Sequence, residues 1–308
     1  IITLSFLIFA GYTPAQLPKK LNEPQKVEPK VDPKPSPKIE LEFVDIPVYR
    51  NVEAGSIYGD VLSRVKGEPY GDKHGRSTNV HETAHKIHSE LRNEYITKLK
   101  KRVNAFYCAN GKAVIIDEPG ITITQIVEFI PENMRSYRYD LYLVQQAKSW
   151  NEVPLYIFDE WNAYVLDGMC SVDDVNRGVH RDGKTDAVSG CMDFSIYAIA
   201  LAMTVEKYDN EYWKTNKQFK NFLKYNLKRA NETFLAGYKM DNFLQFKEQE
   251  KLLKELLESP KAEKMRKFLK DELDGLWLDD KTMKAVASKD DDRRRPLRTF
   301  LERKVLDR

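Results

Sequence analysis

The sequence predicts a mostly helical α+β domain, with a small β element on either side of one central helix and a helical C-terminal part. Three observations carry this prediction. A well-patterned amphipathic helix occupies residues 77–92. Alternating apolar residues precede this helix, and a strong hairpin signal follows it. From residue 210 onward, amphipathic helical patterns follow one another to residue 276.

The length and composition fit an ordinary globular protein. The chain has 308 residues, of which 42% are hydrophobic and 31% charged, which supports one sizeable domain or two small ones. The formal net charge is only +3, so no nucleic-acid partner is expected. The main domain is expected at residues 39–280, with a catalytic part at 39–206 and a helical part at 207–280.

The two ends of the chain differ in composition from the middle. Residues 1–16 hold a short apolar run and then small residues, which resembles a signal peptide and its cleavage site. A bilayer span needs about 20 apolar residues, so no membrane span is expected in the mature chain. Residues 17–38 are rich in Pro and Lys and predict an extended spacer, and 281–308 predict a charged tail. We therefore expect a secreted or cell-envelope-associated protein.

The stretch before the central helix is expected to contribute little regular structure. Residues 39–49 alternate imperfectly between apolar and polar and predict one or two strands. Residues 51–75 are polar and Gly-rich and predict a loop or small subdomain, in which His74 is expected at the surface. The central helix is expected to start at 77–79, because Ser, Thr and Asn are good N-caps. Its apolar residues, spaced by four, three and four, predict a buried stripe: Val80, Ala84, Ile87 and Leu91.

The central helix carries the motif His81-Glu82-x-x-His85. Residues four apart lie one turn above each other, so two imidazoles at this spacing can bind one zinc ion. Zinc lowers the pKa of a bound water from about 15.7 to about 7, and Glu82 is expected to be the general base acting on that zinc-bound water. The alternative is a helix whose histidines face solvent. His88, one turn further along, is interpreted as a support for the ligands or as a plain surface histidine.

A hairpin and a third zinc ligand are expected further along the chain. The Asn110-Gly111 turn between residues 103–108 and 113–116 is the strongest short hairpin signal, and helices are expected at 122–129 and 139–147. Residues 154–168 form a very apolar pattern, interpreted as a core helix with Gly168 as its C-cap.

A carboxylate in such a helix must be paired or bound to a metal, and zinc needs a third ligand. Glu160 is the best candidate, and Asp159 is the neighbouring alternative. The structural alternative is an ion pair between Glu160 and an arginine or lysine.

The motif helix followed by a helix with Glu160-x-x-Ala163 resembles the gluzincin group of zinc metallopeptidases. The resemblance implies a zincin-like metal helix, and it suggests that the hairpin strand pairs with substrate backbone. It implies the following roles: His81, His85 and Glu160 as zinc ligands, Glu82 as general base, and His180 or Tyr164 as donor to the oxyanion. No Asp follows Glu160 one turn later, so support for a ligating histidine is expected from elsewhere. The candidates are Asp167, Asp186 and Asp193.

Residues 169–191 predict a long polar loop between two apolar helices, the second of them a buried core helix around 194–205. Cys170 and Cys191 bracket this loop and could form a disulfide in an exported protein. In a cytosolic protein, they and Cys108 would be reduced and mostly buried. Helices are expected at 212–236, 242–257 and 262–276, and Asn231 begins a glycosylation sequon.

The predicted function is zinc-dependent hydrolysis of peptide bonds in a protein or peptide substrate, which includes cell-wall peptide. Two alternatives stay open. One is a catalytically inactive binding or structural protein of an envelope or virion that keeps the same fold. The other is a zinc amidase acting on peptidoglycan, which would suit an exported protein held by a spacer.

Overall fold

The structure is a computed structural model of the chain. It describes residues 39–71, 75–182, 184–238, 240–243, 246–278 and 282. The chain divides into two units, Ile1–Pro37 and Lys38–Arg308, and all described residues belong to the second unit. The predicted signal peptide and spacer, His74, and the predicted tail apart from residue 282 lie outside the described residues.

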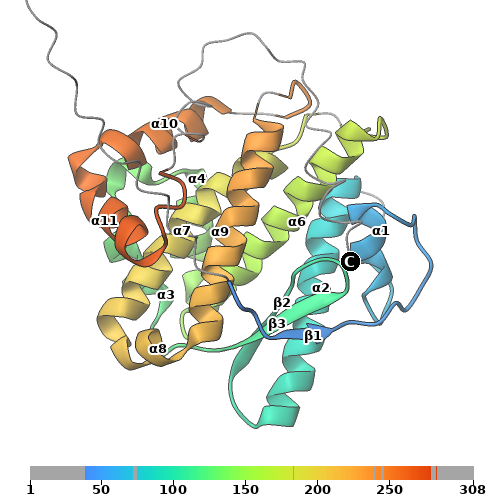
Figure 1. Ribbon diagram of the computed structural model, residues 1–308, viewed down its shortest axis with the longest axis horizontal. Coiled ribbons are helices and arrows are strands. Elements are labelled where there is room, and N and C mark those ends of the chain that lie inside the picture. Colours follow the sequence, from blue (N-terminus) through green and yellow to red (C-terminus); the bar gives the residue numbers. More distant parts are fainter. Residues whose placement is uncertain are drawn as a thin grey trace, which may run out of the picture. The chain divides into compact units, whose positions relative to one another are not determined.

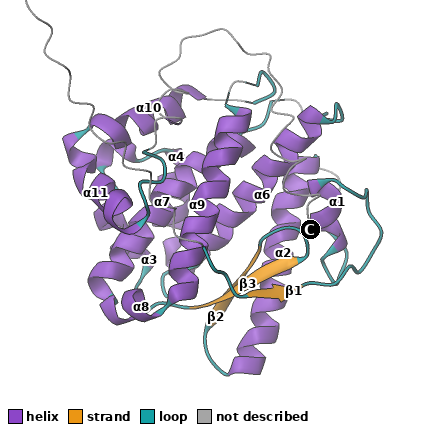
Figure 2. Ribbon diagram, in the orientation of Figure 1, coloured by secondary structure: helices purple, strands orange, loops and turns teal. Residues whose placement is uncertain are grey.

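The β element is a three-stranded antiparallel sheet of β1 (Phe43–Asp45), β2 (Val103–Tyr107) and β3 (Lys112–Asp117), in the order β1-β3-β2 (Figure 2). The predicted hairpin is confirmed as β2 and β3. Residues 109–111 of its turn all have positive φ, a conformation that suits the Asn-Gly pair. Every residue of β2 is buried, so this edge is covered. The suggestion that the hairpin strand pairs with substrate backbone is therefore wrong for β2.

The central helix is α2 (Arg76–Leu99), which starts before the predicted caps. The backbone N–H groups of Arg76 and Ser77 donate to the carboxylate of Asp182, at 3.2 Å and 3.0 Å. The Arg76 guanidinium also pairs with the buried Asp174, at 2.7 Å. The predicted start at residues 77–79 is wrong because an aspartate from a distant loop supplies the cap.

The remaining features of α2 agree with the sequence pattern. The predicted apolar stripe of α2 is fully buried against the sheet and a later helix. The segment 51–75, expected to be a loop or small subdomain, includes the short helix α1 (Ile57–Ser63), which packs on α2. The Ser56 hydroxyl caps α1 by accepting a hydrogen bond from the Gly59 N–H at 2.9 Å.

The segment between the sheet and the next long helix is helical but broken. The predicted helix at 122–129 is present as α3 (Ile123–Ile126) and η2 (Val127–Phe129). The short η3 (Glu132–Met134) follows. The predicted helix at 139–147 becomes α4 (Tyr137–Tyr139), the π-helical η4 (Asp140–Gln145) and α5 (Ala147–Trp150).

The core helix expected at 154–168 is α6 (Tyr156–Asn176), and Gly168 lies within it and is not its C-cap. A Cβ at Gly168 would lie 2.9 Å from Thr233 Cγ2 and 3.0 Å from Cys191 Sγ. The glycine therefore permits close packing of neighbouring helices, which its position in the sequence does not reveal. Because α6 is longer than predicted, the expected loop at 169–191 shrinks to 177–186.

The next helix, α7 (Ala187–Tyr208), confirms the buried core helix. Among the described helices, only α7 is long and apolar enough to cross a membrane, and the apolar window is entirely buried inside the protein. Cys170 on α6, Cys191 on α7 and Cys108 are all buried and free. The Cys170–Cys191 disulfide is therefore absent. The two thiols point to different partners, since Cys170 Sγ faces Asp174 and Cys191 Sγ faces the Tyr164 carbonyl.

The C-terminal helices are α8 (Asn210–Thr215), α9 (Lys217–Gly237), α10 (Phe246–Glu258), η5 (Pro260–Ala262) and α11 (Glu263–Glu272). Helix α9 packs on α6, α7 and β3, so the helical part shares its core with the part that carries the motif (Figure 1). Asn231 on α9 is buried, and its side chain bonds Thr282 at 3.1 Å. The sequon asparagine is therefore inaccessible for glycosylation in the folded protein.

Helix α6 lies at the centre of this arrangement. It packs against α2 on one side and against α7 and α9 on the other (Figure 1). One face of α6 therefore packs directly against the motif helix α2. Side chains on that face, near its N-terminal end, meet the histidines of α2.

Candidate metal centre

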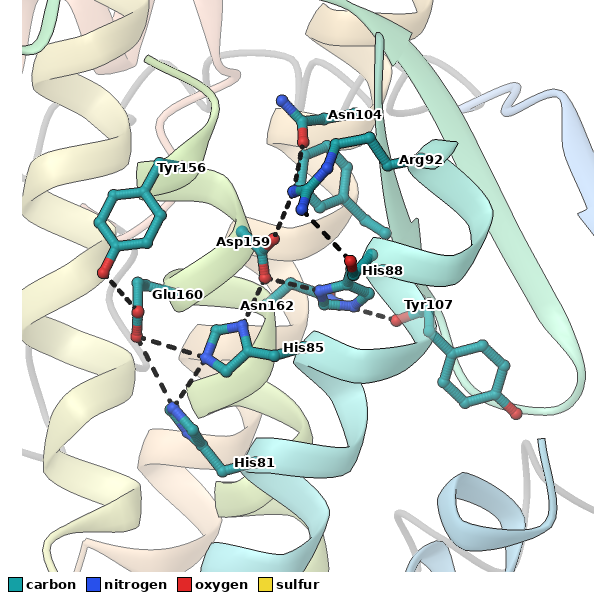
Figure 3. A network of polar contacts seen from close by, with 12 residues as sticks. His81, His85, His88, Arg92, Asn104, Tyr107, Tyr156, Asp159, Glu160 and Asn162 are labelled. Atoms are coloured by element: carbon teal, nitrogen blue, oxygen red, sulfur yellow. Dashed lines mark hydrogen bonds and ion pairs between the residues drawn. The ribbon is translucent and has the colours of Figure 1, made fainter. Parts of the chain in front are cut away.

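Three side chains from two helices converge between α2 and α6 (Figure 3). The Nε2 atoms of His81 and His85 lie 3.1 Å apart, and each lies 3.6 Å from Oε2 of Glu160. Two ligand atoms on a tetrahedral zinc ion, each about 2.0–2.1 Å from it, are about 3.4 Å apart. The three atoms thus have the spacing that one small ion requires.

The two carboxylate oxygens of Glu160 have different surroundings. Oε1 accepts a hydrogen bond from the Tyr156 hydroxyl at 2.7 Å. Oε2 is buried and receives no hydrogen bond, and the two imidazoles it faces are beyond hydrogen-bonding distance. Leaving a buried acceptor unsatisfied costs about 1–3 kcal/mol, and more for a charged group. A cation between Oε2 and the two rings would remove this cost, so the group fits a metal.

The ionisation of Glu160 also suits a ligand. Burial alone would raise the pKa of Glu160. The nearby His81 and His85 rings have a larger effect in the opposite direction, so the pKa falls to about 2. The side chain is therefore a carboxylate at neutral pH. The structural alternative, an ion pair of Glu160 with an arginine or lysine, is not found among the described residues.

Asp159, the neighbouring alternative ligand, has a different role. Its Oδ1 lies 2.5 Å from His85 Nδ1 and 2.8 Å from His88 Nδ1. These are hydrogen-bond lengths, and they are too short for atoms that share one metal ion. Because the carboxylate accepts, Nδ1 of His85 carries a proton, and Nε2 is the nitrogen that faces Glu160 and can bind a metal once it is deprotonated. Burial raises the pKa of Asp159, but the His88 and His85 rings outweigh it and hold the pKa well below its usual range.

Of the three aspartates expected to support a ligating histidine, only Asp167 comes near one, and the two groups are not hydrogen-bonded. Asp167 Oδ2 lies 3.9 Å from His81 Nδ1. Burial raises the pKa of Asp167 to about 6, despite the opposing effect of His81. Asp186 and Asp193 pair instead with the buried Arg138. The support for His85 comes from Asp159, which the sequence offered only as an alternative ligand.

The remaining histidine of the helix, His88, is completely buried. The interpretation of His88 as a plain surface residue is wrong. Its contact with Asp159, which also holds His85, agrees with the other interpretation, as a support for the ligands. The surface interpretation fails because β2 and α6 cover this part of α2, a contact that helical periodicity does not reveal.

Tyr164 contacts one of the three ligand residues, His81. Its ring packs edge-on against His81 with 4.6 Å between centroids, and its hydroxyl lies 3.4 Å from that of Tyr142. Gly190 on α7 makes room for the Tyr164 ring, because a Cβ there would lie 2.2 Å from Tyr164 Cδ1. Burial raises the pKa of Tyr164, so the phenol keeps its proton and can donate a hydrogen bond.

The other two residues with predicted catalytic roles lie in different settings. Glu82 follows His81 on α2 and is half-buried, with no hydrogen bond or ion pair within the described part of the chain. The ring contact described for His180 is with Phe243, at 5.9 Å between centroids. Among the described interactions, none joins His180 to the three ligand residues. The structure therefore brings the Tyr164 ring to His81, whereas the described ring contact of His180 is with Phe243.

Sequence reasoning did not find several residues that hold the site. Tyr156 precedes Glu160 by four residues on the same helix face, a spacing that could have indicated the contact. Arg92 and Asn104 meet near the second oxygen of Asp159, and Asn162 contacts His88. No local signal identifies these three, because their contacts join different elements.

Zinc affinity is expected to rise with pH beyond the usual histidine pKa of about 6.5. Burial lowers the pKa of His85, but the carboxylates of Asp159 and Glu160 raise it well above that value. Zinc must therefore displace a proton from His85, and this competition fades only as the pH rises through the raised pKa. Competition titrations with a chelating dye at pH 6, 7 and 8, corrected for the dye's own protonation, test this. An affinity that is already constant from pH 6 upward would contradict it.

Comparison of the chain with protein-family models, with curated proteins and with solved structures gave no match.

Proposed function

We propose that the protein is a zinc-dependent metallopeptidase, a hydrolase of peptide bonds, in which His81, His85 and Glu160 hold the ion. The observation that carries the proposal is the convergence of three ligand atoms on one point, with a buried Glu160 oxygen that has no hydrogen bond. Charge balance agrees. The Glu160 carboxylate is buried and has no arginine or lysine partner among the described residues, and a divalent cation would offset its charge.

The reaction needs a proton acceptor, which Glu82 supplies. When bound, zinc acts as a Lewis acid that lowers the pKa of water to about 7 and polarises the substrate carbonyl. The Glu82 carboxylate, adjacent to His81 on α2, takes a proton from the attacking water and returns it to the leaving amine. Its lack of a described hydrogen bond or ion pair leaves Glu82 available for this work.

Tyr164 stabilises the negative oxygen of the tetrahedral intermediate by donating a hydrogen bond from its phenolic hydroxyl. Removing one such donor from an enzyme costs about 10²-fold in rate. Tyr164→Phe is therefore expected to lower kcat by about 10²-fold, with unchanged zinc content and little change in KM. Tyr208→Phe, at a tyrosine that is 44% exposed, is the matched control and should keep full activity. If the Tyr164→Phe variant has the same kcat as wild type, Tyr164 is not the donor to the oxyanion.

Hydrolysis by the purified protein tests the proposed function. We expect cleavage of casein that stops with 1,10-phenanthroline and returns when zinc is added back. Release of peptide from purified cell wall, without casein cleavage, would favour the amidase alternative. No hydrolysis of either substrate by zinc-loaded protein would favour the binding or structural alternative. Secretion or envelope association remains a prediction from residues 1–38.

A further inference from the structure

A buried hydrogen-bonded chain runs from the metal centre to the sheet (Figure 3). It begins at His85, passes through Asp159 and His88, and continues through Asn162 to the backbone carbonyl of Tyr107 at the end of β2. The chain therefore joins three elements: α2 supplies both histidines, α6 supplies Asp159 and Asn162, and β2 supplies the carbonyl.

The final contact of this chain determines the proton positions in the others. Asn162 Nδ2 donates one hydrogen to the Tyr107 carbonyl, at 2.8 Å, and the other to His88 Nε2, at 3.1 Å. His88 Nε2 must then carry a lone pair, so a neutral His88 carries its proton on Nδ1. That proton is donated to Oδ1 of Asp159, at 2.8 Å.

The two oxygens of Asp159 are held from different sides. Oδ1 accepts from both His85 and His88, and Oδ2 lies 3.5 Å from Arg92 Nη1. Arg92 Nη1 in turn donates to Asn104 Oδ1 on β2, at 3.2 Å. With both oxygens engaged, the carboxylate cannot rotate without breaking contacts with three residues of α2. The orientation of the His85 ring depends on this carboxylate, since Asp159 is the partner of His85 Nδ1.

We infer that His88 is a positioning residue of the metal centre, which holds Asp159 so that this carboxylate fixes the His85 ring with Nε2 toward the ion. The inference rests on the proposed zinc site and deepens it. A histidine with a purely structural role would stabilise the fold without affecting the metal. In the position seen here, loss of the His88 Nδ1–H bond frees Asp159 to rotate, and the His85 ring loses its fixed direction.

A matched pair of substitutions separates the two bonds of His88. The amide nitrogen of Asn can take the place of Nδ1, whereas that of Gln takes the place of Nε2. His88→Asn therefore keeps the donor to Asp159 and loses the contact with Asn162. His88→Gln removes the donor to Asp159. Support residues of metal sites are worth about 10–100-fold in metal affinity, so the Gln variant should release zinc about 10–100-fold faster than wild type. The Asn variant should stay within about threefold.

Zinc release is measured by trapping the ion with excess chelator after loading the full chain, with a thermal melt of the metal-free protein as the check on folding. Zinc release from folded His88→Gln at the wild-type rate would overturn the inference. Equal acceleration in both variants would also overturn it. These readouts need no hydrolysis, so a wild type that binds zinc but cleaves nothing would refute only the proposed function.

A measurement without substitution covers the case in which the variants do not fold. Nitrogen NMR of histidine-labelled, zinc-loaded wild type should show His88 neutral and protonated on Nδ1 from pH 6 to pH 8. A His88 whose Nδ1 carries no proton would overturn the inference whatever the variants do. Failure of the wild type to bind zinc would instead remove the proposed site itself.

Discussion

Glu82→Gln is expected to lower the rate of peptide hydrolysis by about 10³-fold or more while zinc remains bound. The amide keeps the size of the side chain but cannot accept a proton from the attacking water or return one to the amine. Glu82 is not among the three ligands, so the metal affinity should change little. The measurement is kcat with a peptide substrate, together with zinc content by elemental analysis of the same sample.

Glu94→Gln is the matched control for this experiment. Glu94 lies on the same helix, its side chain is 48% exposed, and it pairs with Lys66 at the surface. The same chemical change there should leave kcat within about twofold, because exposed ion pairs contribute only about 0–1 kcal/mol. Retained hydrolysis in zinc-loaded Glu82→Gln would exclude Glu82 as the general base.

His81→Ala is expected to lose both zinc and activity. The substitution removes one of three ligand atoms and leaves a two-ligand site with His85 and Glu160. Supporting residues are worth about 10–100-fold in metal affinity, so loss of a ligand should exceed about 100-fold. Zinc added to wild type should raise its melting temperature, because an ion bound only by the folded state stabilises it. This shift should be absent in His81→Ala.

His180→Ala is the control for zinc content, since the described ring contact of His180 is with Phe243. It should retain one zinc ion per chain. If His81→Ala retains zinc as tightly as wild type, then the ion lies elsewhere and the ligand set proposed here is wrong.

The local patterns of the sequence predicted the parts of this site that depend on one element. The motif helix, its buried stripe and the hairpin were evident because each is encoded by spacing within a short segment. The candidate Glu160 followed from a general rule, that a carboxylate in an apolar helix needs a partner. The structure places that carboxylate beside His81 and His85.

The errors concern contacts between elements that are distant in the sequence. Asp182 caps α2 although it lies 106 residues after Arg76, and no local sequence pattern predicts such a cap. Gly168 is not a C-cap. It lies inside α6, where the absence of a side chain leaves room for side chains of α7 and α9. Asp159 and Glu160 are adjacent in the sequence, and only the packing of α6 on α2 distinguishes the supporting residue from the ligand.

The central claim is that one zinc ion lies between His81, His85 and Glu160. The most direct test is a crystal of the zinc-loaded protein, with anomalous diffraction measured on both sides of the zinc absorption edge. The account predicts one strong peak about 2.0–2.1 Å from His81 Nε2, His85 Nε2 and Glu160 Oε2. A peak at another place, or a Glu160 carboxylate turned away from an ion held by the two histidines, would contradict it.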